Sequence, residues 1–304
     1  MISATVQALF FSMTLTAVCQ QRPVDTYFSQ LRSGKSPNIP SEVLKPENAK
    51  TVLNALPVYA KDTVVIVRSK ATLIARIVGV KSNLVAIRQQ AVTQIIQAAN
   101  DKSTGNAGAA LNYLTEFRKT DFNKTHRDSL IVLFRRSPPY IDILSKLVGF
   151  LDIKELKNDL FALSQQNTLG RKERWSAMLG LARMNETQAI NDIMNRVKRM
   201  PVTDAVVYEV FPDLVYTRRP EAIAYLVEAL NSDVKNCNSA DAEQDSRIPC
   251  AYRVMEMLAP VIEGFPLKTD DSGDVVSNDY PAALQQARDW FVKNSNYVVL
   301  KNSY

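Results

Sequence analysis

Apolar residues recur with a helical period along most of the chain. Four windows place apolar side chains at positions i, i+3, i+4 and i+7, and they begin at Val92, Leu144, Ile190 and Ile223. This spacing gathers the apolar side chains on one face of an α-helix. No window shows sustained alternation of apolar and polar residues. Only residues 64–67 and 298–300 are candidates for extended structure, and the first of these is expected to begin a buried helix. The pattern therefore predicts an all-α fold.

Short breaks that contain glycine or proline divide these helical windows. They lie at residues 105–108, 138–139, 170, 201 and 220. Both residue types interrupt helices, glycine through its flexibility and proline through its missing N–H group. Breaks this close together predict helices of about 10–15 residues, the usual length in globular proteins.

The predicted helices also recur as units. Arg68, Arg88 and Arg174 each begin an Arg-x-x-Ala sequence before an apolar run, and the last two are separated by about two periods of 43 residues. Residues 171–200 read as two amphipathic helices in succession. These features resemble the HEAT and armadillo families of helical repeats. The resemblance implies an α-solenoid of stacked antiparallel helix pairs over residues 49–268, with an irregular all-α globule as the alternative.

The segments on either side of the repeats have a different character. Residues 20–48 are largely polar and are interrupted by Gly34, Pro37, Pro40 and Pro46, so they are predicted to be a flexible or loosely docked lead-in. Residues 269–304 begin as an acidic loop and continue, from Pro281, as a helix that caps the repeats. Trp290 on this helix is expected to lie in the core, and the tail to Tyr304 to fold back on it.

Residues 1–19 are apolar and small, and no charged side chain precedes Arg22. They resemble a secretory signal peptide, so the protein is expected to be exported, either periplasmic or secreted, with no transmembrane helix in the mature chain. Residues 15–19 also resemble a bacterial lipoprotein box, which would anchor the chain through Cys19. A third alternative is a buried first helix of the mature fold.

The remaining cysteines, Cys237 and Cys250, flank a polar insert. In an oxidising compartment such a pair joins in a disulfide that closes the insert. Two thiols alone do not complete a zinc site. The sequence therefore predicts a disulfide that agrees with export, whereas a cytosolic location would leave two separate thiols.

Basic residues gather near the predicted helix ends. The chain carries 37 basic and 31 acidic side chains, a net charge of +6. In a solenoid, equivalent positions align along one edge, so a basic ridge is predicted from Arg135, Arg136, Arg171, Lys172, Arg174, Lys198, Arg199, Arg218 and Arg219. Such a ridge suits an acidic protein or an anionic polymer. The alternative is that these cations offset the helix dipoles.

Motifs for catalysis are missing from the sequence. His126 is the only histidine and is expected to be exposed or to cap a helix, and no phosphate loop or nucleophile elbow occurs. Carboxylates at Asp270, Asp271 and Asp274 lack the spacing of a calcium loop. We therefore expect a non-enzymatic protein-binding scaffold of the cell envelope or exterior, with no cofactor or metal. The alternative is an anion-binding module, although export argues against nucleic acid as the partner.

Overall fold

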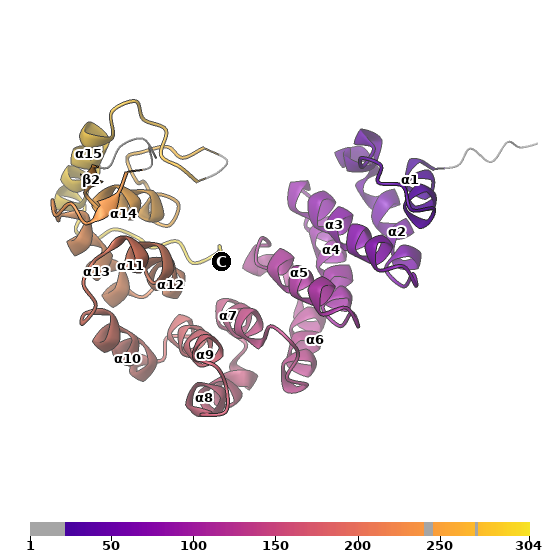
Figure 1. The fold of residues 1–304 in the computed structure, drawn as a ribbon, viewed down its shortest axis with the longest axis horizontal. Helices are drawn as coiled ribbons and strands as arrows, with labels where there is room; N and C mark the ends of the chain where they lie inside the picture. The colour runs from indigo at the N-terminus through magenta and orange to yellow at the C-terminus, as the bar shows by residue number, and fades with distance from the viewer. Residues whose placement is uncertain (1–21, 240–245, 271–272) are drawn as a thin grey trace, which may run out of the picture.

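A computed structural model describes residues 22–239, 246–270 and 273–304 of the chain (Figure 1). Most of these residues are helical, which confirms the all-α prediction. The segment predicted to be a signal peptide, residues 1–19, lies outside the described residues, and so does Cys19 with its predicted lipid anchor.

The helices follow one another with short connections. The first half of the chain forms α1 (Pro23–Arg32), α2 (Ala49–Tyr59), α3 (Val65–Lys81), α4 (Val85–Ala98), α5 (Thr104–Leu114), α6 (Lys124–Arg135) and α7 (Ile141–Leu151). The second half forms α8 (Lys157–Gln165), α9 (Arg171–Arg183), α10 (Thr187–Val197), α11 (Asp204–Glu209), α12 (Phe211–Thr217), α13 (Pro220–Leu230), α14 (Ala251–Leu258) and α15 (Tyr280–Lys293). Short 3-10 turns lie at Ser41–Leu44, Pro46–Asn48, Lys119–Asp121 and Lys154–Leu156.

Helices pack against their neighbours in the sequence. Most contact the next helix and several contact the next but one, such as α3 with α5, α7 with α9 and α12 with α14. Together they form an open arc, with α1 at one end and α15 at the other (Figure 1). The core runs along the arc as one continuous row of buried apolar side chains.

Residues 20–48 differ from the prediction of a flexible lead-in, because helix α1 within them packs against the arc. One face of α1 buries Val24, Tyr27, Phe28 and Leu31, and the Phe28 ring stacks on Tyr59 of α2 with ring centres 3.9 Å apart. Apolar residues at helical spacing hold this segment against the arc despite its polar composition. The rest of the lead-in contains only 3-10 turns, as its prolines require.

Glycines 105 and 108 also differ from their prediction as a break, because both lie inside α5. A β-carbon at Gly108 would lie 2.6 Å from the Tyr140 ring, so glycine there permits the ring to approach the helix. The residue serves close packing rather than chain reversal.

A second close approach joins α7 and α9. A β-carbon at Gly149 would lie 2.5 Å from the backbone of Gly180, and one at Gly180 would lie 2.6 Å from the carbonyl oxygen of Ser145. The two helix backbones therefore touch at this crossing. This contact brings Phe150, which follows Gly149, beside Arg183 at the end of α9.

The Arg-x-x-Ala sequences mark buried ion pairs in two of their three occurrences. Arg68 pairs with Asp101 at 2.6 Å and Arg88 pairs with Asp121 at 2.7 Å, and all four side chains are buried. Each arginine also donates to a carbonyl oxygen six residues earlier in the chain. The third arginine, Arg174, instead donates to Asn167. The sequence repeat thus reflects one recurring contact in α3 and α4.

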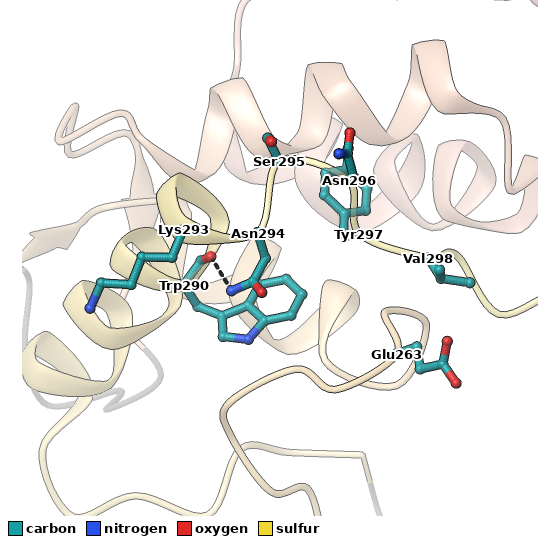
Figure 2. A pocket seen from close by; sticks show the side chains of 8 residues that line it. All are labelled: Glu263, Trp290, Lys293, Asn294, Ser295, Asn296, Tyr297 and Val298. Atoms are coloured by element: carbon teal, nitrogen blue, oxygen red, sulfur yellow. Dashed lines mark hydrogen bonds between the residues drawn. The ribbon is translucent and has the colours of Figure 1, made fainter.

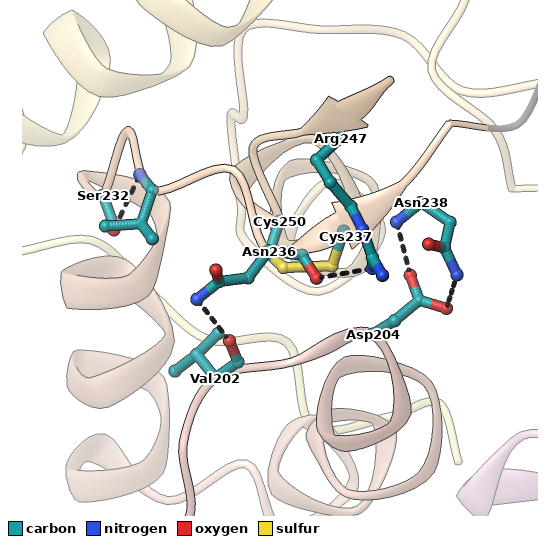
Figure 3. Close-up of a disulfide and its surroundings, with 9 residues drawn as sticks. Val202, Asp204, Ser232, Asn236, Cys237, Asn238, Arg247 and Cys250 are labelled. Carbon is teal, nitrogen blue, oxygen red and sulfur yellow. Dashed lines mark hydrogen bonds between the residues drawn. A yellow bond between two sulfur atoms is a disulfide. The ribbon is translucent and has the colours of Figure 1, made fainter. Parts of the chain in front are cut away.

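A disulfide joins Cys237 to Cys250, as the sequence predicted (Figure 3). Two short antiparallel strands, β1 (Cys237–Asn238) and β2 (Arg247–Ile248), lie beside it. Asp204 of α11 accepts hydrogen bonds from the backbone and side-chain amides of Asn238. The disulfide and these bonds fix the base of the insert to the arc.

Candidate functional site

The C-terminal segment, residues 294–304, leaves α15 and crosses the inner side of the arc (Figure 1). Its first residues surround a cavity of about 370 Å³ beside Trp290, where the Asn294 side chain donates to the Trp290 carbonyl (Figure 2). Trp290 itself is half-buried and packs against Phe265 and Phe291. The segment thus starts from a fixed aromatic cluster.

Extended backbone continues from this cluster. The Glu263 N–H donates to the Val298 carbonyl at 2.9 Å, and the Leu300 N–H donates to the Val261 carbonyl at 2.8 Å. Ile262 and Val299 face each other in this antiparallel pairing. Residues 298–300 are therefore extended, in agreement with the sequence pattern.

Two arginines then hold the main chain of the segment. Arg218 donates to the main-chain oxygens of Leu300 at 3.0 Å and Tyr304 at 2.9 Å. Arg183 donates to those of Lys301 at 3.1 Å and Ser303 at 2.8 Å. Four backbone acceptors in five residues are bound in this way, and the Lys119 N–H donates to a fifth, the carbonyl of Asn302.

Both arginines lie at helix ends and are buried. Arg183 is the last residue of α9, and Arg218 ends α12 with a left-handed backbone. Their side chains also donate to carbonyls of the α12 end, from Arg183 to Tyr216 and from Arg218 to Val215. The last carbonyls of a helix lack intrahelical partners, so cations there are favourable.

Burial sets the electrostatics of this arginine pair. Burial, together with the like charge of Arg183, lowers the pKa of Arg218 to about 9, and burial also lowers the pKa of Arg183. Both guanidinium groups remain charged at neutral pH. Among the described residues, no acidic side chain forms an ion pair with either, and main-chain oxygens supply most of their acceptors.

Tyr304 ends the segment in an aromatic cluster. Its ring lies 5.7 Å from that of Phe150 and 5.1 Å from that of Tyr216. The Arg183 guanidinium lies over both of these rings, at 5.6 Å and 5.5 Å. Burial raises the pKa values of the Tyr216 and Tyr304 hydroxyls, which stay protonated at neutral pH. Arg183, Arg218, Phe150 and Tyr216 form a site that the C-terminal segment fills, and we call this filled site the inner groove.

Polar contacts behind the inner groove hold Tyr216 in place. Its hydroxyl donates to the Lys146 carbonyl, and the Lys146 ammonium pairs with Asp213 at 2.8 Å. The Trp175 indole N–H donates to the second oxygen of Asp213 at 2.7 Å. Helices α7, α9 and α12 are therefore tied together directly behind the groove.

The structure distributes the predicted basic-ridge residues among several environments. Arg218 lies in the inner groove. Acidic side chains pair with three others: Asp159 with Arg135, Asp142 with Lys172 and Glu221 with Arg219. Exposed positions beyond helix ends are held by Arg136, Lys198 and Arg199. These last positions agree with the alternative of cations at helix C-terminal ends.

A second cavity, of about 670 Å³, collects the remaining predicted cations. Arg171, Lys172 and Arg174 line it from α9, and Arg196 lines it from α10, with Trp175 and Glu209 among the other lining residues. Arg196 and Arg171 are exposed. Several cationic side chains and the Trp175 indole therefore line the same cavity.

Sequence reasoning missed Arg183, Phe150 and Tyr216. Arg183 was hidden because it ends an apolar run, Leu179–Ala182, where it resembles an ordinary helix-ending cation. One signal in the sequence could have revealed Arg183: a charged residue lies on a helix face that is otherwise apolar. A buried arginine requires hydrogen-bond acceptors, so such a position indicates a polar contact. The two rings carried no polar pattern that distinguishes a groove from a core.

His126 is buried and caps α6, which agrees with the capping alternative and excludes exposure. The Asn123 side chain accepts from the His126 N–H, the Asn123 N–H donates to Nδ1, and Nε2 lies 2.7 Å from the Thr93 hydroxyl. Burial lowers the pKa of the imidazole. Both ring nitrogens are engaged in structural contacts.

Comparison of the chain with protein-family models, with curated proteins and with solved structures gives no match in any of the three. Within residues 22–239, 246–270 and 273–304, no three His, Cys, Asp or Glu side chains are grouped so as to hold a metal ion. Nor does any described helix have the length and apolar character needed to span a membrane.

Proposed function

We propose that this protein is a non-enzymatic, exported scaffold that binds another protein along the inner side of a HEAT-like α-solenoid. The observation that carries the proposal is the inner groove, where buried arginines hold an extended polypeptide by its backbone. A surface that binds one extended segment has the donors and the shape to bind another.

The arrangement of the helices supports the solenoid part of the proposal. Contacts between helices that are adjacent or next but one in the chain are typical of repeat proteins, in which each unit packs only on its neighbours. The recurring buried pairs of Arg68 and Arg88 support repetition in α3 and α4. Export is supported by the disulfide, because such bonds persist in oxidising compartments.

A second candidate function rests on the cavity that Arg171, Arg174 and Arg196 line. Several cations around one opening, with the Trp175 ring among them, suit an anionic polymer such as an acidic polysaccharide. This candidate retains the predicted anion-binding module, although it uses only part of the predicted ridge.

One retention experiment distinguishes the two functions. The disulfide-bonded chain is immobilised and exposed to material from the exterior of its source cells, in 50 mM and then 500 mM NaCl. A scaffold retains a discrete protein, and retention falls less than about threefold with salt because uncharged contacts dominate. An Arg171→Gln, Arg196→Gln double variant retains the same protein and serves as the matched control.

The opposite outcome would establish the second candidate. Retention of a polysaccharide or nucleic acid, falling about a hundredfold or more over this tenfold change in salt and lost in the double variant, indicates release of counterions from a polyanion. That result would contradict the protein-binding function.

A further inference from the structure

The inner groove contacts its occupant mainly through the main chain of the occupant, and much less through its side chains. Four main-chain oxygens between Leu300 and Tyr304 accept from Arg183 and Arg218, whereas the side chains of residues 301–303 are exposed. The one side-chain hydrogen bond is long, 3.5 Å from Arg218 to the Ser303 hydroxyl. Backbone recognition of this kind tolerates many sequences.

An empty inner groove would leave buried donors without acceptors. Without the segment, Arg218 would lose the acceptors of Nε and Nη2, and Arg183 those of Nη2. Buried charged groups that lack hydrogen-bond partners are strongly unfavourable. The groove therefore requires an occupant that offers a row of carbonyl oxygens in extended geometry.

The aromatic end of the groove adds a requirement for one side chain. Tyr304 fills the space between Phe150 and Tyr216 while Arg183 covers both of those rings. Aromatic residues in such pockets are the usual anchors of an interface. An occupant that carries an aromatic residue four positions after its first bound carbonyl matches both parts of the groove.

From these contacts we propose that the inner groove binds an extended segment of a partner protein that carries an aromatic anchor, and that residues 300–304 are a built-in ligand which this segment displaces. The proposal rests on the proposed scaffold function and specifies which chemistry the scaffold recognises.

A different protein is a better occupant than a second copy of this chain. A second copy would bring an identical segment with identical contacts, and it would also lose translational freedom on binding. The intramolecular segment benefits from a high effective concentration, so only a partner with additional contacts displaces it.

The test uses a fluorescein-labelled peptide with the sequence of residues 298–304, followed by fluorescence anisotropy. It is added to the full chain and to a chain that lacks residues 300–304, after circular dichroism and urea unfolding show that the shortened chain is folded. We expect saturable binding to the shortened chain and at least tenfold weaker binding to the full chain, whose own segment competes. A full-length Tyr304→Ala chain, which keeps the backbone contacts, should bind with intermediate affinity and replaces the shortened chain if that chain does not fold.

Matched variants locate the binding. In the shortened chain, Arg218→Asn should weaken binding at least tenfold, and asparagine tolerates the left-handed backbone at that position. Arg136→Asn, an exposed residue beyond a helix end, should leave binding unchanged. A peptide with Tyr304→Ala should bind at least tenfold more weakly, whereas one with Lys301→Ala should bind like the parent.

Three results would overturn the proposal. They are no binding to a folded shortened chain, equal binding to the full and shortened chains, and a concentration-dependent dimer of the full chain formed by exchange of the segment. None of them bears on the retention experiment, because a scaffold whose partner uses another face would still retain a protein there. The two proposals therefore fail separately.

Discussion

Arg183 and His126 are both buried at helix ends, and burial lowers the pKa of each with opposite consequences for charge. The ordinary pKa of arginine is so high that a buried guanidinium stays charged after the pKa is lowered. A buried, charged guanidinium then requires hydrogen-bond acceptors. Arg183 finds them in Tyr216 and in the C-terminal segment. An imidazole starts near 6.5, so a lower pKa leaves His126 neutral at pH 7, able to accept from the Asn123 N–H.

The single histidine makes its titration directly measurable. Its NMR signal should give a pKa below 6.5 in the folded chain, because burial disfavours the charged imidazole. The unfolded chain takes up this proton near pH 6.5 and the folded chain only at lower pH. The contribution of His126 to stability is therefore complete above pH 6.5 and is lost as the pH falls through the folded value.

Urea unfolding at several pH values between 7.5 and 5 checks this linkage. A His126→Gln variant should lose part of the decrease in unfolding free energy that the parent shows over this range. An imidazole signal that titrates at or above pH 6.5 would contradict the assignment.

At the scale of helices, the sequence predicted which faces are apolar, but it did not predict where two helices pack closely against each other. The windows that begin at Leu144, Ile190 and Ile223 lie within helices, and the one that begins at Val92 ends at the C-cap of α4, because apolar spacing depends on the chain alone. Whether a glycine breaks a helix or admits a neighbour depends on which helix packs there. That is why Gly108 was predicted as a break and the crossing of Gly149 with Gly180 was not foreseen.

The α7–α9 crossing should respond sharply to a single methyl group. In Gly149→Ala the new β-carbon would lie 2.5 Å from the Gly180 backbone, so the helices must separate. We expect the unfolding free energy, measured in urea, to fall by about 2–3 kcal/mol, as in overpacked cores. The matched control is Gly105→Ala, where the nearest atom is 4.0 Å away and a gain of about 0.5–1 kcal/mol is expected from helix propensity. Equal stability of the two variants would show that the crossing is loose.

On the scale of the whole molecule, the C-terminal segment connects parts of the arc that are distant in sequence. It pairs with residues 261–263, binds Arg218 and Arg183, and reaches Lys119 near the middle of the chain. The candidate site could not be predicted from sequence because its parts come from α7, α9, α12 and the tail. The sequence did predict the extended character of residues 298–300 and the cation Arg218. It also predicted a tail that folds back on the capping helix, but the end of the tail instead binds Arg183 and Arg218.

Removing residues 300–304 should therefore loosen the arc as well as open the groove. Small-angle X-ray scattering should give a larger radius of gyration for the shortened chain, and backbone amides at the ends of α9 and α12 should exchange hydrogen faster. A Lys301→Ala chain is the control, since its exposed side chain is removed and its carbonyl remains. Unchanged dimensions and exchange in the shortened chain would show that the segment lies on the arc without supporting it.

The backbone contacts of this segment have a consequence for how its sequence can vary. Lys301 and Ser303 accept from Arg183, and Asn302 accepts from the Lys119 N–H, through carbonyls that every amino acid possesses, so substitutions there leave these contacts intact. Insertion or deletion of one residue between Leu300 and Tyr304 would instead shift the tyrosine away from Phe150 and Tyr216. The amino acids at residues 301–303 can therefore change during evolution, whereas the number of residues between Leu300 and Tyr304 cannot.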